Sequence, residues 1–409
     1  MLNLKLAYRN LFRNVRRTVL TVLLIASSLA ALILADAMIG GLRNKMVEGV
    51  THLLSGEAQV HRTGYLDTLD ADLFLPDPDA LLALLADDPA VRGYAPRAIT
   101  GGMVSSPYNV AGGFLYGIVP ERERDVSRIA EAVVRGEYLT GATGEILMGT
   151  DLADLLEVDL GDRIVVTVAQ VDGGELSQAL FRLSGITDLG VRELDSSAVF
   201  VNLGEAQVTL GLARGVHEIA IRYAKGEDSA DVAHPLLTRL NATPAGGPVE
   251  ALGWMEFNPG MGQIVQMTAF STLIMGSVLF LIASFGVINS MFMSIYERIY
   301  EFGVIKALGS RPTGIVGLVL WEATLIALLS CLVGLLLGGS LAWHFSVNGM
   351  SLGEFDMAGM TVDKFDAVVR FEQFVNFPIY VTILTLIAAL YPARFAARIV
   401  PTEALQKTL

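Results

Sequence analysis

The side chains best suited to chemistry in the central part of this 409-residue chain are its histidines. His52, His61, His217 and His234 stand far apart, and none has a second histidine four residues further on. A metal site on one helix face needs that spacing. We therefore expect these histidines to be surface or structural residues rather than metal ligands.

Two further kinds of chemistry find no support in the sequence. No glycine is followed directly by a lysine, so the Gly-Lys step of a phosphate-binding P-loop is missing. The one cysteine, Cys331, lies in an apolar run and has no disulfide partner or cysteine co-ligand. We expect no catalytic, cofactor-binding or metal-binding residues here, and no ATP hydrolysis by this chain alone.

The most informative local pattern is a charged segment between two apolar ones. One face of a helix over this segment is expected to carry Tyr296, Ile299, Tyr300, Gly303, Val304, Ala307 and Leu308. The residues away from that face are four charged ones, Glu297, Arg298, Glu301 and Lys306, and an apolar pair, Phe302 and Ile305. Gly309 and Pro312 then end the helix.

Apolar residues on two sides of this helix predict that both sides are buried against other groups. The membrane or its spans would cover the first face, and another protein would cover Phe302 and Ile305. A hairpin that merely lies on lipid is the alternative.

Composition places the elements around this segment in a membrane. Hydrophobic residues make up 53% of the chain, charged residues 17%, and the mean hydropathy is +0.53, whereas soluble domains are about 25% charged. Spans of roughly 20 apolar residues are needed to cross a bilayer, and four segments qualify: residues 18–40, 266–296, 315–345 and 374–393. We expect a membrane protein with four transmembrane α-helices and a large α+β domain outside the cytoplasm, between helices 1 and 2.

Positive residues near the spans predict the orientation. The basic helix expected over residues 1–17 contains Lys5, Arg9, Arg13, Arg16 and Arg17 and no acid, which favours a cytoplasmic N-terminus. Four spans bring the tail, residues 394–409, to the same side. Residues 297–314 are then cytoplasmic, and residues 41–265 and the loop 346–373 are external.

The net charge of −13 is concentrated in the external region. Residues 41–265 contain 16 Lys and Arg against 32 Asp and Glu, which argues against a nucleic-acid-binding role. The basic start, the apolar run and Ala35–Ala37 also fit a cleavable signal peptide. Because the apolar run exceeds the usual length of such a signal, we favour an uncleaved anchor.

The external region mixes strand and helix patterns. Strands are expected at "GEAQVHR", "DRIVVTVAQV", "SSAVFVN" and "HEIAIRY", and helices at "DPDALLALLADD" and "ERERDVSRIAEAVVRG". Gly- and Pro-bearing breaks predict two subdomains, with an inner insertion at about residues 99–195.

Two carboxylates fall within or beside the predicted spans. Asp36 is expected at the outer membrane boundary, and Glu322, inside the third span, is expected to pair with a helix end or a neighbouring span rather than relay protons. Small residues four apart in "GLLLGG" allow two helices to approach closely.

The segment "ERIYEFGVIKALGS" resembles the E-R-x-x-E-[IF]-G-x-x-x-A-L-G signature of permease subunits in the MacB, FtsX and LolC/LolE superfamily, the mechanotransmitting (type VII) ABC transporters. The basic start, the single span, the large external domain and the three later spans extend the likeness over the whole chain. LolE-like permeases are the most similar, since the chain has no fused ATPase domain and a larger external domain than FtsX.

The resemblance implies that the charged helix couples the chain to a separate cytoplasmic ABC ATPase. The residues assigned to this coupling are Glu297, Arg298, Glu301, Phe302, Gly303, Ile305, Ala307, Leu308 and Gly309. It further implies a dimer with a second copy or a paralogue, two ATPase subunits that use ATP and magnesium, and a location in the bacterial inner membrane with a periplasmic domain.

The resemblance also suggests a substrate. A LolE-like permease extracts lipoproteins from the inner membrane and passes them to a periplasmic carrier. The acyl chains are then expected near the outer ends of the first two spans, at Met38, Ile39, Leu42, Met261, Ile264, Val265, Met267 and Phe270. MacB-like efflux of peptides or small molecules through a periplasmic adaptor, and FtsX-like control of a cell-wall hydrolase, are the alternatives.

Overall fold

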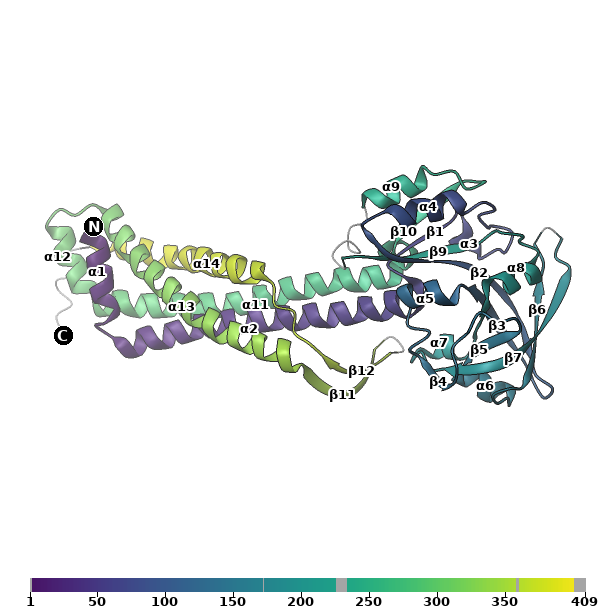
Figure 1. Ribbon diagram of the computed structural model, residues 1–409. Coiled ribbons are helices and arrows are strands. Elements are labelled where there is room, and N and C mark those ends of the chain that lie inside the picture. Colours follow the sequence, from purple (N-terminus) through teal and green to yellow (C-terminus); the bar gives the residue numbers. More distant parts are fainter. Residues whose placement is uncertain (1, 172, 226–233, 358–359, 401–409) are drawn as a thin grey trace. The chain divides into compact units, whose positions relative to one another are not determined.

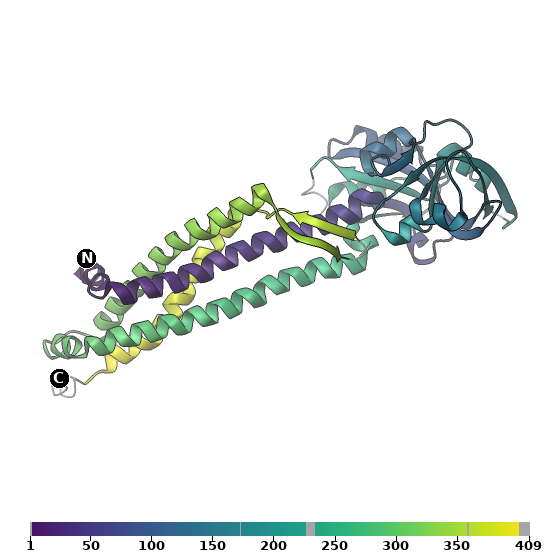
Figure 2. The same cartoon turned by 90° about the horizontal axis from the view of Figure 1, so that it is seen from below.

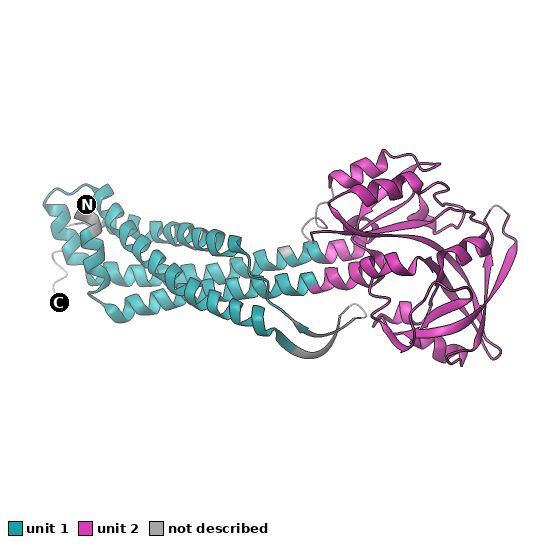
Figure 3. Cartoon of the chain, viewed as in Figure 1, with its two compact units in different colours: residues 1–44, 265–353, 363–409 teal, residues 45–264, 354–362 magenta. Residues whose placement is uncertain are grey.

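The computed structural model describes residues 2–171, 173–225, 234–357 and 360–400. The chain divides into two compact units (Figure 3). Unit 1 comprises Met1–Asn44, Val265–Gly353 and Asp363–Leu409, and unit 2 comprises Lys45–Ile264 and Glu354–Val362.

Unit 1 is built on long helices that lie side by side (Figures 1 and 2). Among the described residues, four helices are long and apolar enough to cross a membrane: α2 (Val15–Val50), α11 (Pro259–Glu297), α13 (Pro312–Asn348) and α14 (Phe371–Arg398). Two shorter helices, α1 (Leu2–Leu11) and α12 (Ile299–Ala307), accompany them. The first two long helices continue beyond unit 1 into the residues of unit 2.

All four helices extend past their predicted spans at both ends. The expected ranges were 18–40, 266–296, 315–345 and 374–393, whereas α2 begins at Val15 and α14 ends at Arg398. Hydropathy marks only the part of a helix that needs hydrocarbon around it, while helical hydrogen bonding continues until a cap or a break stops it. The basic segment 1–17 is likewise divided, because α1 ends at Leu11 before α2 begins.

The small residues of α13 pack against α2, as the sequence predicts. A Cβ atom added at Gly334 would lie 3.0 Å from the carbonyl oxygen of Ala26, and one added at Gly338 would lie 2.8 Å from Cα of Ala30. Hydrogen side chains at both positions therefore let the two helix backbones approach closely.

The segment predicted as a loop over residues 346–373 contains regular structure. Strands β11 (Met350–Met357) and β12 (Met360–Phe365) form a two-stranded sheet between α13 and α14. At the other end of unit 1, α14 runs into the predicted tail, of which residues 401–409 lie outside the described residues.

Unit 2 begins with the last residues of α2, which is followed by a single turn of π-helix, η1 (Thr51–Ser55). Its strands are β1 (Ala58–Arg62), β2 (Val91–Ser105), β3 (Val110–Ile118), β4 (Val133–Gly136), β5 (Glu145–Gly149), β6 (Arg163–Ala169), β7 (Leu176–Thr187), β8 (Ala198–Asn202), β9 (Glu218–Tyr223) and β10 (Val249–Gly253). Its α-helices are α3 (Tyr65–Thr68), α4 (Asp79–Asp87), α5 (Pro120–Val126), α6 (Thr150–Leu156), α7 (Arg192–Asp195), α8 (Leu203–Leu210), α9 (Pro235–Asn241) and α10 (Trp254–Phe257).

The long strand β2 joins two parts of the unit 2 sheet. Its first half pairs with β9, in the order β10-β1-β9-β2, and its second half pairs with β3, leading on to β8, β5, β7 and β4. Strand β6 pairs with both β7 and β2, so the second part closes on itself. A shared apolar core that includes Val60, Leu115 and Ile164 lies under both parts.

Two sequence expectations for unit 2 need correction. The predicted helix over "ERERDVSRIAEAVVRG" ends at Val126, because Val133–Gly136 pairs with β7 as strand β4. The predicted insertion 99–195 stops before β8, which pairs with β3 and β5 and so belongs to the same closed part. Sheet pairing decides both boundaries, and local sequence pattern does not report it.

Candidate functional site

The charged segment forms a sharp junction between two helices of unit 1. Helix α11 ends at Glu297, Arg298 leaves helical geometry, and α12 begins at Ile299. Gly309 adopts a positive φ of 89° just after α12. This left-handed conformation favours glycine, so the predicted end of the helix is confirmed.

Arg298 anchors the junction to the third span. Its Nη1 lies 3.3 Å from Oε2 of Glu322 on α13, and its Nε donates to Glu301 at 3.1 Å. The hydroxyl of Ser294 donates to the other oxygen of Glu322 at 3.3 Å. Arg298 and Glu322 are both buried, so the expectation that Glu322 pairs rather than relays protons is supported by a defined partner.

The two glutamates of the junction bind the N-terminal segment. Arg17 donates to Glu297 at 2.7 Å, Asn14 donates to the same carboxylate at 3.3 Å, and Arg13 pairs with Glu301. Burial raises the pKa of the Glu301 carboxyl, but hydrogen bonds from Arg13 and Arg298 outweigh it and hold that pKa below its usual value. The ionised form of Glu301 is therefore the one that joins the N-terminus to the junction.

Lys306 ties the other end of α12 to the fourth span. Its ammonium group donates to the carbonyl oxygens of Ala397 at 2.8 Å and Ile399 at 2.9 Å. Carbonyls at the end of α14 have no partner within their own helix, and a cation suits that end of the dipole. Together with the contacts of Arg298 and Glu301, they hold α12 against α13, α14 and the N-terminal segment.

The Phe302 side of α12, predicted to meet another protein, packs inside unit 1. Phe302 is 2% exposed and belongs to the apolar core of the long helices, whereas Tyr300 is 51% exposed and Leu308 is 83% exposed. The guanidinium of Arg298 lies 5.2 Å from the centre of the Phe302 ring. Tyr300 and Leu308 belong to the stripe predicted to face the membrane or its spans and are exposed within this chain, whereas Gly303 of the same stripe is buried.

The predicted coupling residues accordingly fall into three groups. Arg298, Phe302 and Gly303 are buried, Glu301 and Ile305 are partly buried, and Glu297, Ala307, Leu308 and Gly309 are exposed. The exposed group, with Tyr296 and Tyr300, forms what we call the α12 outer surface.

The residues predicted near the substrate lie on α2 and α11. Met38, Ile39 and Leu42 are partly buried on α2, and Met261 and Val265 are partly buried on α11. Ile264, Met267 and Phe270 are exposed, Met267 and Phe270 to 67% each. The exposed residues are apolar, as lipid-facing positions on a membrane helix must be.

Sequence reasoning missed the partners of the junction. Arg13 and Arg17 served only to predict orientation, Asn14 had no assigned role, and Lys306 had no assigned partner. One sequence feature could have indicated this network. Glu322 is a carboxylate within a predicted span, and the charged residues just before that span were its available partners.

A second ionic cluster lies toward the other end of unit 1. Asp36 is buried and accepts hydrogen bonds from Arg370 at 2.8 Å and Gln373 at 2.6 Å, at the start of α14. The carboxylate that the sequence places near the outer boundary is therefore paired across two spans.

Neither metal nor nucleophile chemistry has a visible site in the described ranges. Within residues 2–171, 173–225, 234–357 and 360–400, no three His, Cys, Asp or Glu side chains gather as metal ligands would. A G-x-S-x-G spacing does occur at residues 349–353, but it follows a helix and opens strand β11. A nucleophile elbow requires the opposite order, strand then helix.

Fold and junction together define a multi-pass membrane protein with one large inserted domain. Residues 18–238, more than half of the chain, match the family described as MacB-like periplasmic core domain. Residues 273–401 match the family described as FtsX-like permease C-terminal.

Similar proteins of known name extend these matches. The lipoprotein-releasing system transmembrane protein LolC of Xylella fastidiosa (strain 9a5c) is 26% identical over 342 residues, which cover 80% of each chain. LolC of Neisseria meningitidis serogroup B is 21% identical over 404 residues, covering 95% of this chain and 94% of the relative. LolE of Haemophilus influenzae is 22% identical, covering 78% and 79% respectively.

The chain therefore belongs to the superfamily of ABC transporter permeases that includes MacB, FtsX, LolC and LolE. It is a membrane subunit of the bacterial inner membrane with a periplasmic-type core domain.

Proposed function

We propose that this permease couples ATP hydrolysis by a separate cytoplasmic ATPase to rearrangement of its periplasmic domain, and so releases lipoproteins from the inner membrane. Similarity over 80% of its length to a protein named for lipoprotein release supports the substrate class. Both termini would be cytoplasmic, and the permease itself would hold no ATP or magnesium.

One observation carries the coupling role: the ionic network that fixes α12. Arg298, Glu297, Glu301 and Lys306 are engaged by α13, the N-terminal segment and the end of α14. A helix held at so many points cannot tilt without moving the helices that hold it. Force applied to the α12 outer surface by an ATPase would therefore reach α2 and α11, the helices that continue into the external domain.

The ATPase would dock on the α12 outer surface rather than on Phe302. Leu308, Ala307 and Tyr300 offer exposed apolar contacts, and Gly309 lets a partner approach the backbone. Exposed apolar residues beside charged ones are typical of protein interfaces. Two ATPase subunits would serve a dimer formed with a second copy or a related permease.

Acyl chains would contact the exposed side of α11 around Met267 and Phe270, with Met38, Ile39 and Leu42 on α2. Methionine adapts its shape to variable apolar ligands. A periplasmic lipoprotein carrier would then accept the released substrate.

The test is to purify the permease with the ATPase from its native host in nanodiscs and to identify co-purifying molecules by mass spectrometry before and after ATP. Triacylated lipoproteins that leave only with ATP are the expected result. An adaptor, a cell-wall hydrolase or an empty complex without lipoprotein would overturn the proposed substrate in favour of efflux or hydrolase control.

A further inference from the structure

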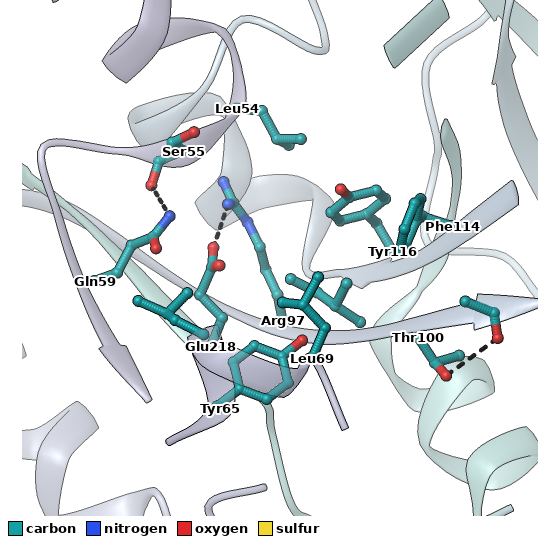
Figure 4. A pocket seen from close by; sticks show the side chains of 13 residues that line it. Leu54, Ser55, Gln59, Tyr65, Leu69, Arg97, Thr100, Phe114, Tyr116 and Glu218 are labelled. Carbon is teal, nitrogen blue, oxygen red and sulfur yellow. Dashed lines mark hydrogen bonds and ion pairs between the residues drawn. The ribbon is translucent and has the colours of Figure 1, made fainter. Parts of the chain in front are cut away.

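A small cavity lies within unit 2, where the first membrane helix enters the domain (Figure 4). Its volume is about 190 Å³, and its walls come from η1, α3 and strands β1, β2, β3 and β9. Leu54 and Ser55 of η1 form part of the wall. Since η1 continues α2 without a break, anything bound here would touch the segment that leads into the membrane.

One end of the cavity is formed by buried charges. Arg97 is 1% exposed and binds Glu123 through two hydrogen bonds, of 3.1 and 2.5 Å. It donates a third bond to Oε1 of Glu218 at 2.6 Å. Arg97 and Glu218 both line the cavity, as Figure 4 shows. One guanidinium thus faces two carboxylates, and His61, the other group beside Glu218, adds positive charge only when it is protonated.

The second oxygen of Glu218 makes no hydrogen bond among the described residues. It faces Nε2 of His61 at 3.6 Å, a separation too long for a hydrogen bond. Both ring nitrogens of His61 lack a hydrogen-bond partner among the described residues, although the ring is fully buried. A ligand N–H group would supply what this carboxylate oxygen lacks.

The remaining wall is aromatic and aliphatic. Tyr65, Tyr116 and Phe114 line the cavity with Leu54 and Leu69. Burial, with the negative charge of Glu218 adding to it, raises the pKa of Tyr116 to about 12, so its hydroxyl stays protonated. Aromatic faces beside a carboxylate attract organic cations.

We propose that this cavity binds a small aromatic ammonium ion, consisting of one ring and a protonated amine. The ring would lie among Tyr65, Phe114 and Tyr116, and the ammonium would donate to Glu218. The size agrees, because an apolar protein cavity of about 150 Å³ accepts benzene. This site is separate from the membrane helices to which the lipoprotein proposal assigns the acyl chains.

The experiment compares three probes of similar size and different charge on the full chain in nanodiscs. Benzylamine, benzyl alcohol and benzoate are titrated by calorimetry. Benzylamine should bind about tenfold more tightly than benzyl alcohol, and benzoate should bind most weakly. No binding of benzylamine, equal affinities or the reverse order would overturn the proposal.

A matched pair of variants separates the cavity from the lipid. Gly101 lines the cavity, and a Cβ there would lie 3.9 Å from Phe114, so Gly101→Leu adds a side chain at the cavity without a clash at its Cβ. Gly112 lies on the adjacent strand with nothing within 4 Å of its Cβ position, so Gly112→Leu is the control. Binding of benzylamine should be lost in the first variant and kept in the second. Equal binding by both variants would show that the amine enters the lipid instead.

Discussion

Glu322 shows how a single intramembrane carboxylate can organise a junction. It is buried on α13, yet its partners Arg298 and Ser294 come from the junction and from the end of α11. Removing one member of a buried ion pair leaves an uncompensated charge, whereas replacing both can be nearly neutral. Comparing the single variant with the double variant therefore tests the ion pair more directly than either single substitution.

We expect Glu322→Ala to lower the free energy of unfolding by up to about 3–5 kcal/mol, because it leaves buried Arg298 with only the partly exposed Glu301 as an ionic partner. The double variant Arg298→Met with Glu322→Ala should be more stable than Glu322→Ala alone. Thermal unfolding in nanodiscs measures both. Additive losses in the double variant would contradict the pairing.

His217 gives the external domain a dependence on pH. It is buried, its Nδ1 accepts from the backbone N–H of Ile99 at 3.0 Å, and its Nε2 lies 2.9 Å from the carbonyl oxygen of Ala71. Burial lowers the pKa of His217 below 6.5, against a smaller opposing effect of Ala71. Below pH 6.5 the unfolded chain therefore takes up a proton that the native state resists.

The contribution of His217 to stability is complete above pH 6.5 and is lost as the pH falls toward the lowered pKa of the folded state. Unfolding of the domain, followed by tryptophan fluorescence, should move to lower temperature between about pH 7.5 and about pH 5.5. His217→Asn keeps an acceptor for Ile99 but cannot titrate there. The same pH dependence in this variant would assign the effect to other groups.

At the scale of elements, the contact between α13 and α2 depends on two glycines. Gly338→Leu would place side-chain atoms against the backbone of Ala30, and overpacking of this kind typically costs about 1–3 kcal/mol. Gly314→Leu is the matched control on the same helix, because a Cβ there meets nothing within 4 Å. The yield of folded protein and its unfolding temperature should fall only for Gly338→Leu. Equal losses in the two variants would contradict a specific packing role for Gly338.

Elements with a strong local pattern could be predicted from the sequence. The apolar runs indicated the four long helices, and the strand patterns around Val60, Val166, Phe200 and Ile219 correspond to β1, β6, β8 and β9. Strand β4 was predicted as helix, because "AVVRG" becomes extended only through its pairing with β7. Local sequence pattern indicates periodicity and turn residues, but it does not show which strands pair with each other.

The orientation of α12 could not be predicted for a related reason. Apolar spacing predicted that another protein would cover Phe302, yet Phe302 packs in the core of the long helices, next to the buried pair of Arg298 and Glu322. That pair joins residues 24 positions apart. The identity of the motif residues was therefore available from the sequence, but their division into buried anchors and exposed contacts was not.

For the whole molecule, the question is which end of the long helices receives the ATPase. Leu308, just after α12, and Phe371, at the start of α14, are exposed to 83% and 82%. Lys306 of α12 binds the C-terminal end of α14, whereas Phe371 begins that helix, so Leu308 and Phe371 lie toward opposite ends of unit 1. They provide a matched pair of apolar positions, of which only Leu308 belongs to the proposed docking surface.

We expect Leu308→Arg to abolish co-purification of the ATPase and the ATP-dependent release of lipoprotein, while the permease remains folded. A charge buried without a partner in an apolar interface typically costs several kcal/mol, enough to dissociate a complex of ordinary affinity. Phe371→Arg should leave the ATPase bound, because it alters the opposite end of the helices. Pull-down on a tagged ATPase measures both. Loss of the ATPase in Phe371→Arg but not in Leu308→Arg would reverse the proposed orientation, and retention in both would remove α12 from the docking surface.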